Sequence, residues 1–155
     1  MLPDDPPQVL QGRQRVSGVE IGTGGHITRY WKIYGAYTFM DTEIVKSNTP
    51  AEVGMEIQNA PRNSANLWMT YQYRRFMIGG GPRYIGKRYG NNINTRSVDG
   101  YWTLEGLASY AVSQHFDLRV NLYNLNNAYY FDRLGGGHLI PGMARSLMFS
   151  SNIKF

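Results

Sequence analysis

The feature that most constrains this chain is a strict alternation of apolar and polar side chains over short stretches. The clearest stretch is 115–123. An extended strand would place its apolar side chains on one face, namely Phe116, Leu118, Val120 and Leu122, and its polar ones, Asp117, Arg119 and Asn121, on the other. A helix would mix the two sets. About seven such stretches follow one another from Arg13 onward, so the pattern predicts an all-β chain.

Composition supports strands and excludes several chemistries. Aromatic residues make up 14% of the chain and glycine occurs 18 times, which suits pleated strands joined by turns. There is no cysteine, so disulfides, zinc thiolate sites, iron–sulfur clusters and thiol catalysis are excluded. The net charge is +5, but Lys and Arg are scattered singly and form no basic stripe, so we expect no nucleic-acid partner.

The gaps between the stretches alternate between short and long. Short gaps lie near 23–28, at 74–75 and near 113–115, and long gaps run over about 42–63, 87–100 and 126–144. In an antiparallel sheet this order puts every short gap at one end and every long gap at the other. Membrane β-barrels have tight periplasmic turns and long external loops, so the pattern predicts an antiparallel transmembrane β-barrel segment of about seven strands.

Aromatic placement separates this prediction from a soluble alternative. A soluble β-sandwich or lipocalin-like barrel also alternates, but it more often buries aromatic side chains in mid-strand. Here they would form two interfacial girdles. Those expected near the short turns are Trp31, Tyr73, Phe76, Tyr110, Phe116 and Phe155, and those expected near the long loops are Phe39 and Trp102.

Four stretches, taken in order, resemble the closing strands of TonB-dependent receptors, and of their siderophore-receptor branch in particular. They are 15–20 followed by 31–41, then 59–68, then 84–89 leading to 108–110, and finally 121–130 with 141–145 and the terminal Phe155. Each is weak alone. Together they cover nearly everything from Gly12 to the end.

The resemblance implies a function and a place. Residues 13–155 would form the last strands of a 22-stranded barrel in the outer membrane of a Gram-negative bacterium, and residues 1–12 would be a loop or a truncated start. The intact receptor would take up a ferric siderophore, with no cofactor bound directly. Contact with TonB would run only through an N-terminal plug that this sequence lacks, so the chain looks like a fragment. Outer-membrane lipid and the barrel-assembly machinery are the other implied partners.

Two groups of residues follow from the resemblance. In or beside external loops, aromatic and cationic side chains could bind an anionic ferric chelate: Arg88, Tyr89, Tyr129, Tyr130 and Arg133. The alternative for each is an ordinary solvated loop residue or interfacial anchor. At the terminus, a signal read by the barrel-assembly machinery would comprise Leu147, Phe149, Ile153 and Phe155. Its alternative is a plain amphipathic edge strand.

The sequence suggests no enzyme. The histidines are isolated, so no metal-ligand spacing is visible, and there is neither a nucleophile elbow nor a convincing pair of carboxylates. In 79–82, three glycines and Pro82 predict a bulge or a break in a strand. Two other functions remain open, namely a small self-contained outer-membrane barrel with a structural or adhesive role and a soluble binding module.

Overall fold

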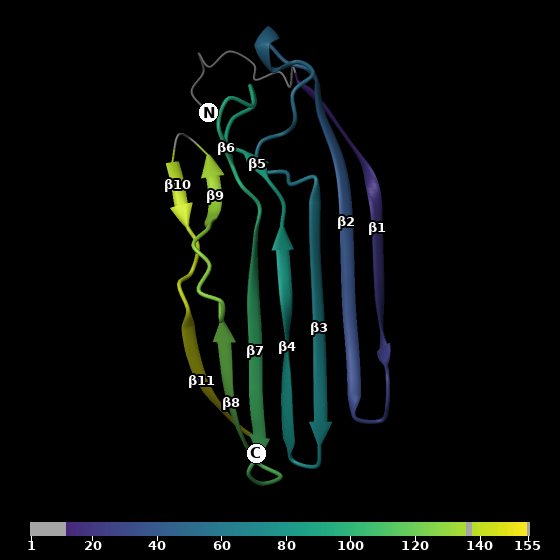
Figure 1. Cartoon of the computed structure of the whole chain (residues 1–155), viewed down its shortest axis with the longest axis vertical. Coiled ribbons are helices and arrows are strands. Elements are labelled where there is room, and N and C mark those ends of the chain that lie inside the picture. Colours follow the sequence, from purple (N-terminus) through teal and green to yellow (C-terminus); the bar gives the residue numbers. More distant parts are fainter. Residues whose placement is uncertain (1–11, 136–137, 155) are drawn as a thin grey trace, which may run out of the picture.

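The computed structural model describes residues 12–135 and 138–154. Its main element is one antiparallel sheet of seven strands, in the order β1-β2-β3-β4-β7-β8-β11 (Figure 1). These strands are β1 (Arg13–His26), β2 (Trp31–Lys46), β3 (Asn63–Tyr73), β4 (Phe76–Ile85), β7 (Tyr101–Ala111), β8 (Phe116–Tyr123) and β11 (Ser146–Ile153). The long connections hold two small hairpins, β5 (Arg88–Tyr89) with β6 (Ser97–Val98) and β9 (Phe131–Gly135) with β10 (His138–Pro141), and a short 3-10 helix, η1 (Pro50–Glu52).

Cross-strand pairing gives the sheet one continuous apolar face. Residues directly opposite one another in an antiparallel ladder point to the same side of the sheet. One row crosses four strands and consists of Ile78, Ala108, Val120 and Phe149. On the other face, Ser109 opposes Arg119, which opposes Ser150. The predicted division of 115–123 into an apolar and a polar set is therefore confirmed.

The apolar face is exposed and has no core beneath it. Among the described residues only Ile44 and Leu134 are buried apolar side chains, whereas Leu118 is 46% and Phe149 78% exposed. A soluble sandwich would bury one face of its sheet under a second layer. Here the described strands form a single layer (Figure 1). An apolar surface of this extent suits contact with lipid.

Aromatic side chains border the apolar face at both ends. At the short-turn end Phe76 pairs with Tyr110, and at the loop end Tyr84 pairs with Trp102. On each strand the two aromatic residues lie eight positions apart, which is about 26 Å along the strand. For a barrel strand tilted by about 40°, this corresponds to about 20 Å along the membrane normal. Tyr73 extends the lower row onto β3, opposite Phe76. Trp31 and Tyr71 form the next row up, with ring centroids 5.0 Å apart. The two predicted girdles are present in the described residues.

The turns match the predicted alternation, with two displaced boundaries. β2 runs to Lys46, although the long gap was expected from about Thr42. The short connections are 27–30, 74–75 and 112–115, and the long ones are 47–62, 86–100 and 124–145. β1 runs through Gly24 and Gly25, where a turn was expected, because these glycines pair with Tyr34 and Ile33 of β2. The Tyr34 ring lies 3.3 Å from where a Cβ on Gly24 would stand. An aromatic side chain across from it thus covers the strand glycine.

Of the two outcomes predicted for 79–82, the structure shows a break towards β3 and no bulge. β4 pairs with β7 from Phe76 to Ile85 without any shift in register. Towards β3 the register is also unchanged, but the pairs opposite Gly81 and Pro82 are missing. Pro82 has no N–H to donate, so the ladder is interrupted there on one side only.

Gly81 lies too close to β3 for any side chain. A Cβ at this position would stand 1.8 Å from the carbonyl oxygen of Leu67, which belongs to the neighbouring backbone and cannot simply rotate away. We expect Gly81→Ala, in a barrel carrying this segment, to lower the free energy of unfolding by about 1–3 kcal/mol by forcing β3 and β4 apart. Heat-modifiable gel migration measures the loss. Gly25→Ala is the matched control, since no atom lies within 4 Å of its Cβ position, and equal effects of both substitutions would refute the explanation.

The sheet is open in the part of the chain that the structure describes. β1 and β11 are the two outer strands and do not pair with each other. No helix among these residues is long and apolar enough to cross a membrane.

Candidate functional site in the long loops

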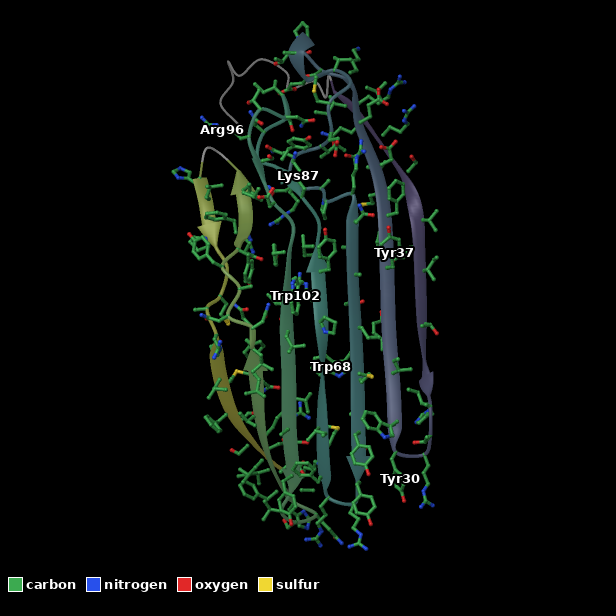
Figure 2. The ribbon with its side chains drawn as sticks, in the orientation of Figure 1. Tyr30, Tyr37, Trp68, Lys87, Arg96 and Trp102 are labelled. Carbon is green, nitrogen blue, oxygen red and sulfur yellow. The ribbon has the colours of Figure 1, made fainter. Side chains whose placement is uncertain are left out.

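The three long connections gather at one end of the sheet (Figure 1). Figure 2 shows Lys87 and Arg96 at this end and Tyr30 at the opposite one. The connections carry six Lys or Arg and four Asp or Glu, so both charge signs are present. Their contacts with one another define the candidate site.

Asn59 joins all three connections. Its backbone N–H donates to the carbonyl of Tyr89 at 2.8 Å. Its side-chain amide pairs with Leu134 in both directions, because Nδ2 donates to the Leu134 carbonyl while Oδ1 accepts from the Leu134 N–H at 3.1 Å. Asn59 adopts a φ of 59°, a left-handed conformation that Asn tolerates better than most residues. One side chain thus replaces a short piece of β-ladder between segments 75 positions apart in the sequence.

Other asparagines repeat this device. Asn94 (φ 55°) pairs with the backbone of Glu56, accepting from its N–H at 2.8 Å and donating to its carbonyl at 2.9 Å. Asn124 (φ 49°) is buried and donates to the carbonyls of Ala128 and Met143, each at 2.9 Å. Asn126 docks on β7, where it accepts from the N–H of Leu104 at 2.9 Å. The loops are therefore held by side-chain amides at defined points.

Arg88 is a second link between loops. It is only 6% exposed, and its guanidinium donates to the carbonyls of Phe131 and of Asp132, the latter at 2.7 Å. The guanidinium also lies 5.7 Å from the centre of the Tyr101 ring. Its Nε has no hydrogen-bond partner among the described residues. A buried charge satisfied by two carbonyls fixes the hairpin β9–β10 against β5.

Aromatic packing supports the base of the same connection. The rings of Tyr130 and Tyr101 stack with centroids 4.1 Å apart. Gly142 lies under Tyr130, since a Cβ there would stand 2.0 Å from a ring carbon. Tyr129, by contrast, is 79% exposed and meets only the edge of Phe131, at 5.5 Å.

A hollow of about 470 Å³ opens beside the hairpin β9–β10. It is lined by Asn59, Arg88, Asp132, Arg133, Leu134, His138 and Ile140. A neighbouring hollow of about 480 Å³ shares Leu134 and His138 and adds Arg96. Three arginines and one carboxylate therefore surround the pair of hollows, which favours an anionic ligand. Volumes of this size are typical of small-molecule sites.

The predicted ligand residues are only partly brought together. Arg88 and Arg133 line the same hollow, and the Arg133 side chain is 79% exposed. Tyr89 lines neither hollow, although its chain neighbours Arg88 and Gly90 do, and the ammonium of Lys87 lies 5.0 Å from its ring. Tyr129 and Tyr130 do not line either hollow. His138, Asn59 and Arg96 were missed, because isolated polar residues in a loop carry no periodic signal.

The predicted assembly signal falls on the last strand. Leu147, Phe149 and Ile153 lie on the apolar face of β11 and are 58%, 78% and 58% exposed. Phe155 lies outside the described residues. The placement agrees equally with a plain edge strand, so the assembly role stays a prediction.

A one-layer antiparallel sheet with a lipid-facing apolar band, tight turns at one end and interlocked loops at the other defines the wall of an outer-membrane β-barrel. The family described as TonB dependent receptor-like, beta-barrel, matches residues 3–125. The chain belongs to this family of Gram-negative outer-membrane receptors, which confirms the resemblance read from the four sequence stretches.

Individual proteins similar to this chain are receptors or transporters with the same barrel fold. The siderophore receptor PiuA of Acinetobacter baumannii is 31% identical over 93% of this chain, and its crystal structure superposes with a TM-score of 0.83. The catecholate siderophore receptor Fiu of Escherichia coli K12 is 29% identical over 98% of the chain. The ferric citrate transporter FecA shares the fold at a TM-score of 0.84 with 18% identity. The chain spans about a fifth of the length of the curated relatives, 21% for both PiuA and Fiu.

Proposed function

We propose that this segment is part of the barrel wall of a TonB-dependent receptor that takes up ferric siderophores, and that the hollow beside hairpin β9–β10 lies on the path of the ligand. The observation that carries the proposal is the excess of guanidinium groups around that hollow, where Arg88, Arg96 and Arg133 face a single carboxylate, Asp132. An anionic iron chelate would be attracted there. The named relatives PiuA and Fiu are siderophore receptors, which supports the same ligand class.

The geometry indicates different roles for the two predicted arginines, Arg88 and Arg133. Both terminal nitrogens of Arg88 donate to carbonyl groups, so Arg88 positions the hairpin. Arg133 is exposed at the hollow, and within the described part of the chain its one ion pair is with the adjacent Asp132, at 3.8 Å. In this proposal Arg133 contacts the chelate, and the chain binds and conducts a ligand without catalysing a reaction. Energy would come from TonB through a plug domain outside this segment, and β11 would serve the barrel-assembly machinery.

The test uses an intact receptor, either the parent of this segment or PiuA with the matching strands replaced by residues 13–153. It is expressed in an iron-starved strain that lacks its own siderophore receptors. We expect growth on a ferric catecholate and loss of that growth when TonB is deleted. Growth independent of TonB, or none with any of a panel of ferric siderophores despite a folded barrel at the surface, would refute the function.

Arg133→Gln should weaken binding of the ferric chelate about fivefold, because it removes one exposed charge at the hollow at a cost of about 1 kcal/mol. Arg145→Gln is the matched control. It removes an exposed arginine from the same connection, and Arg145 lines neither hollow. Binding is measured by titration with the purified receptor in detergent. Equal weakening by both variants would show a general charge effect and not a site.

A further inference from the structure

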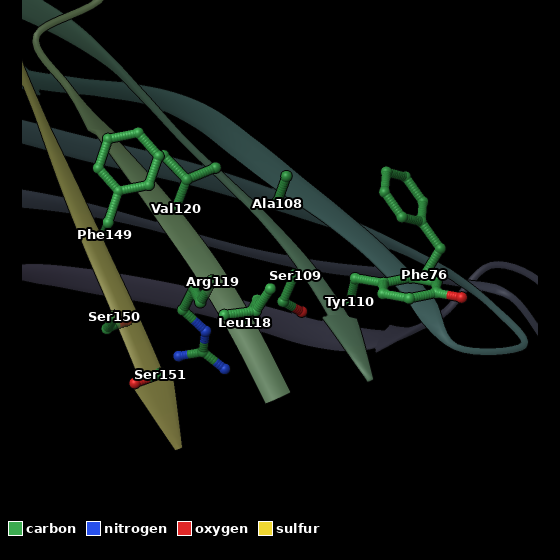
Figure 3. A pocket seen from close by; sticks show the side chains of 10 residues that line it. All are labelled: Phe76, Ala108, Ser109, Tyr110, Leu118, Arg119, Val120, Phe149, Ser150 and Ser151. Carbon is green, nitrogen blue, oxygen red and sulfur yellow. The ribbon is translucent and has the colours of Figure 1, made fainter. Parts of the chain in front are cut away.

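A third hollow lies at the other end of the sheet, on its apolar face near the short turns. It measures about 530 Å³ and spans β4, β7, β8 and β11. Its apolar lining consists of Phe76, Ala108, Tyr110, Leu118, Val120 and Phe149. Figure 3 shows Phe149, Val120 and Phe76 on one side of these strands and Arg119 on the other.

The shape of this hollow follows from side-chain size. Ala108 stands between Ile78 and Val120 in its row, and the next row towards the turns holds Phe76, Tyr110 and Leu118. A methyl group among larger side chains leaves a groove. Because this face meets lipid, an acyl chain lying in the groove would gain dispersion contacts that a flat wall does not offer.

One short turn next to the groove consists of two arginines, Arg74 and Arg75, and the other, 112–115, has no Asp or Glu. The three short connections contain Arg29, Arg74 and Arg75 and no carboxylate. In contrast, the long connections contain four carboxylates, at Glu52, Glu56, Asp99 and Asp132. Asp117 of β8 lines one polar hollow together with Arg74 and Arg75, but its carboxylate already pairs with Lys154 at 3.1 Å.

These arginines are held at the level of the aromatic girdle. The guanidinium of Arg29 lies 4.4 Å from the centre of the Tyr30 ring, and that of Arg74 lies 5.3 Å from the centre of the Tyr73 ring. Arg75 donates to the carbonyl of Val112 at 3.2 Å. Guanidinium groups bind phosphate through paired N–H donors, and aromatic girdles lie at the depth of lipid headgroups.

We propose that an anionic phospholipid of the periplasmic leaflet binds at this place. Its phosphate is held by Arg74 and Arg75, and one of its acyl chains lies in the groove over Ala108. The phosphate site and the acyl-chain groove adjoin, because Arg75 directly precedes Phe76, which lines the groove. The proposal rests on the barrel fold and the family, and it is independent of the ligand bound by the external loops.

The experiment measures lipid retention by native mass spectrometry, with an intact barrel carrying this segment. The barrel is titrated with phosphatidylglycerol or phosphatidylethanolamine at low lipid ratios. We expect about tenfold tighter binding of the first phosphatidylglycerol, given two basic residues near one headgroup. The double variant Arg74→Gln, Arg75→Gln should remove this preference. The matched control is Arg13→Gln with Lys46→Gln, which removes two positive charges from facing positions at the loop end of β1 and β2.

A third variant tests the groove separately from the charges. Ala108→Phe fills the hollow without changing charge, so it should lower retention of both lipids while the ratio between them persists. Heat-modifiable gel migration establishes that each variant is folded. Equal retention of both lipids by the unaltered barrel, an equal loss of preference in the control pair, or full displacement by glycerol phosphate would overturn the proposal.

Discussion

Replacing Arg88 with alanine should loosen the hairpin β9–β10, which Asn59 still holds through Leu134, while leaving the seven-stranded sheet intact. The substitution removes two hydrogen bonds from a charged donor, each worth about 1.5–3 kcal/mol, and leaves the carbonyls of Phe131 and Asp132 without this donor. The link lies wholly within the loops, so the strand ladders are unaffected. We expect faster hydrogen exchange across 86–100 and 124–145 and a loss of ferric chelate binding of at least about tenfold, which corresponds to about 1.4 kcal/mol.

Two further variants distinguish the hydrogen-bonding role of Arg88 from the effect of its positive charge. Arg88→Lys keeps the charge but has no planar fork to reach two carbonyls, so it should behave nearly like alanine. Arg145→Ala removes an exposed arginine from a connected segment and should leave exchange unchanged. If Arg88→Ala abolished binding while exchange in both loops stayed at its original rate, Arg88 would be a direct ligand contact, and its positioning role would be wrong.

The sequence was sufficient to predict the sheet because alternation is a local property. Whether Leu118 and Val120 share a face depends only on their separation along an extended chain. Gap lengths then gave the two ends, and the aromatic positions gave the two borders. The short turn at Arg74–Arg75 was predicted at its observed position, although Arg74 has a φ of 53° there, where glycine or asparagine is usually favoured.

The loop cluster was not predictable in the same way, since its contacts join distant segments. Nothing near Asn59 indicates that its amide pairs with Leu134, and nothing near Arg88 indicates burial. The sequence does indicate where the loops turn, because the long connections are rich in asparagine, the residue best suited after glycine to left-handed backbone. That signal marks where a loop turns. It cannot name the partner.

The prediction at Gly81–Pro82 was right for one side of β4 only, for the same reason. Glycine and proline weaken an isolated strand, but β4 lies between two partners, and its ladder with β7 is complete. The missing bonds face β3 alone. The local rule predicted the break towards β3, but it could not show that the ladder with β7 stays complete.

Expressed by itself, the 155-residue chain should not form a monodisperse folded monomer in detergent. Half of the backbone N–H and C=O groups of an outer strand point away from the sheet, and β1, with 14 residues, is exposed along its whole length. In lipid or detergent each unpaired group costs several kcal/mol, and neither β1 nor β11 has an outer partner among the described residues. The edges should therefore pair with other copies.

Size-exclusion chromatography with circular dichroism checks this expectation, and refolded full-length PiuA is the control. We expect β-rich material at the void volume for the 155-residue chain and a single peak for PiuA. A monomer with heat-modifiable migration would instead indicate a self-contained small barrel, and a monomer in buffer without detergent would indicate a soluble module. The first result would mean that the outer edges of β1 and β11 are satisfied within this chain, because an open sheet in an apolar medium has no other way to pair them. The second would mean that the sheet is not a lipid-facing wall, since water can hydrogen-bond to open strand edges.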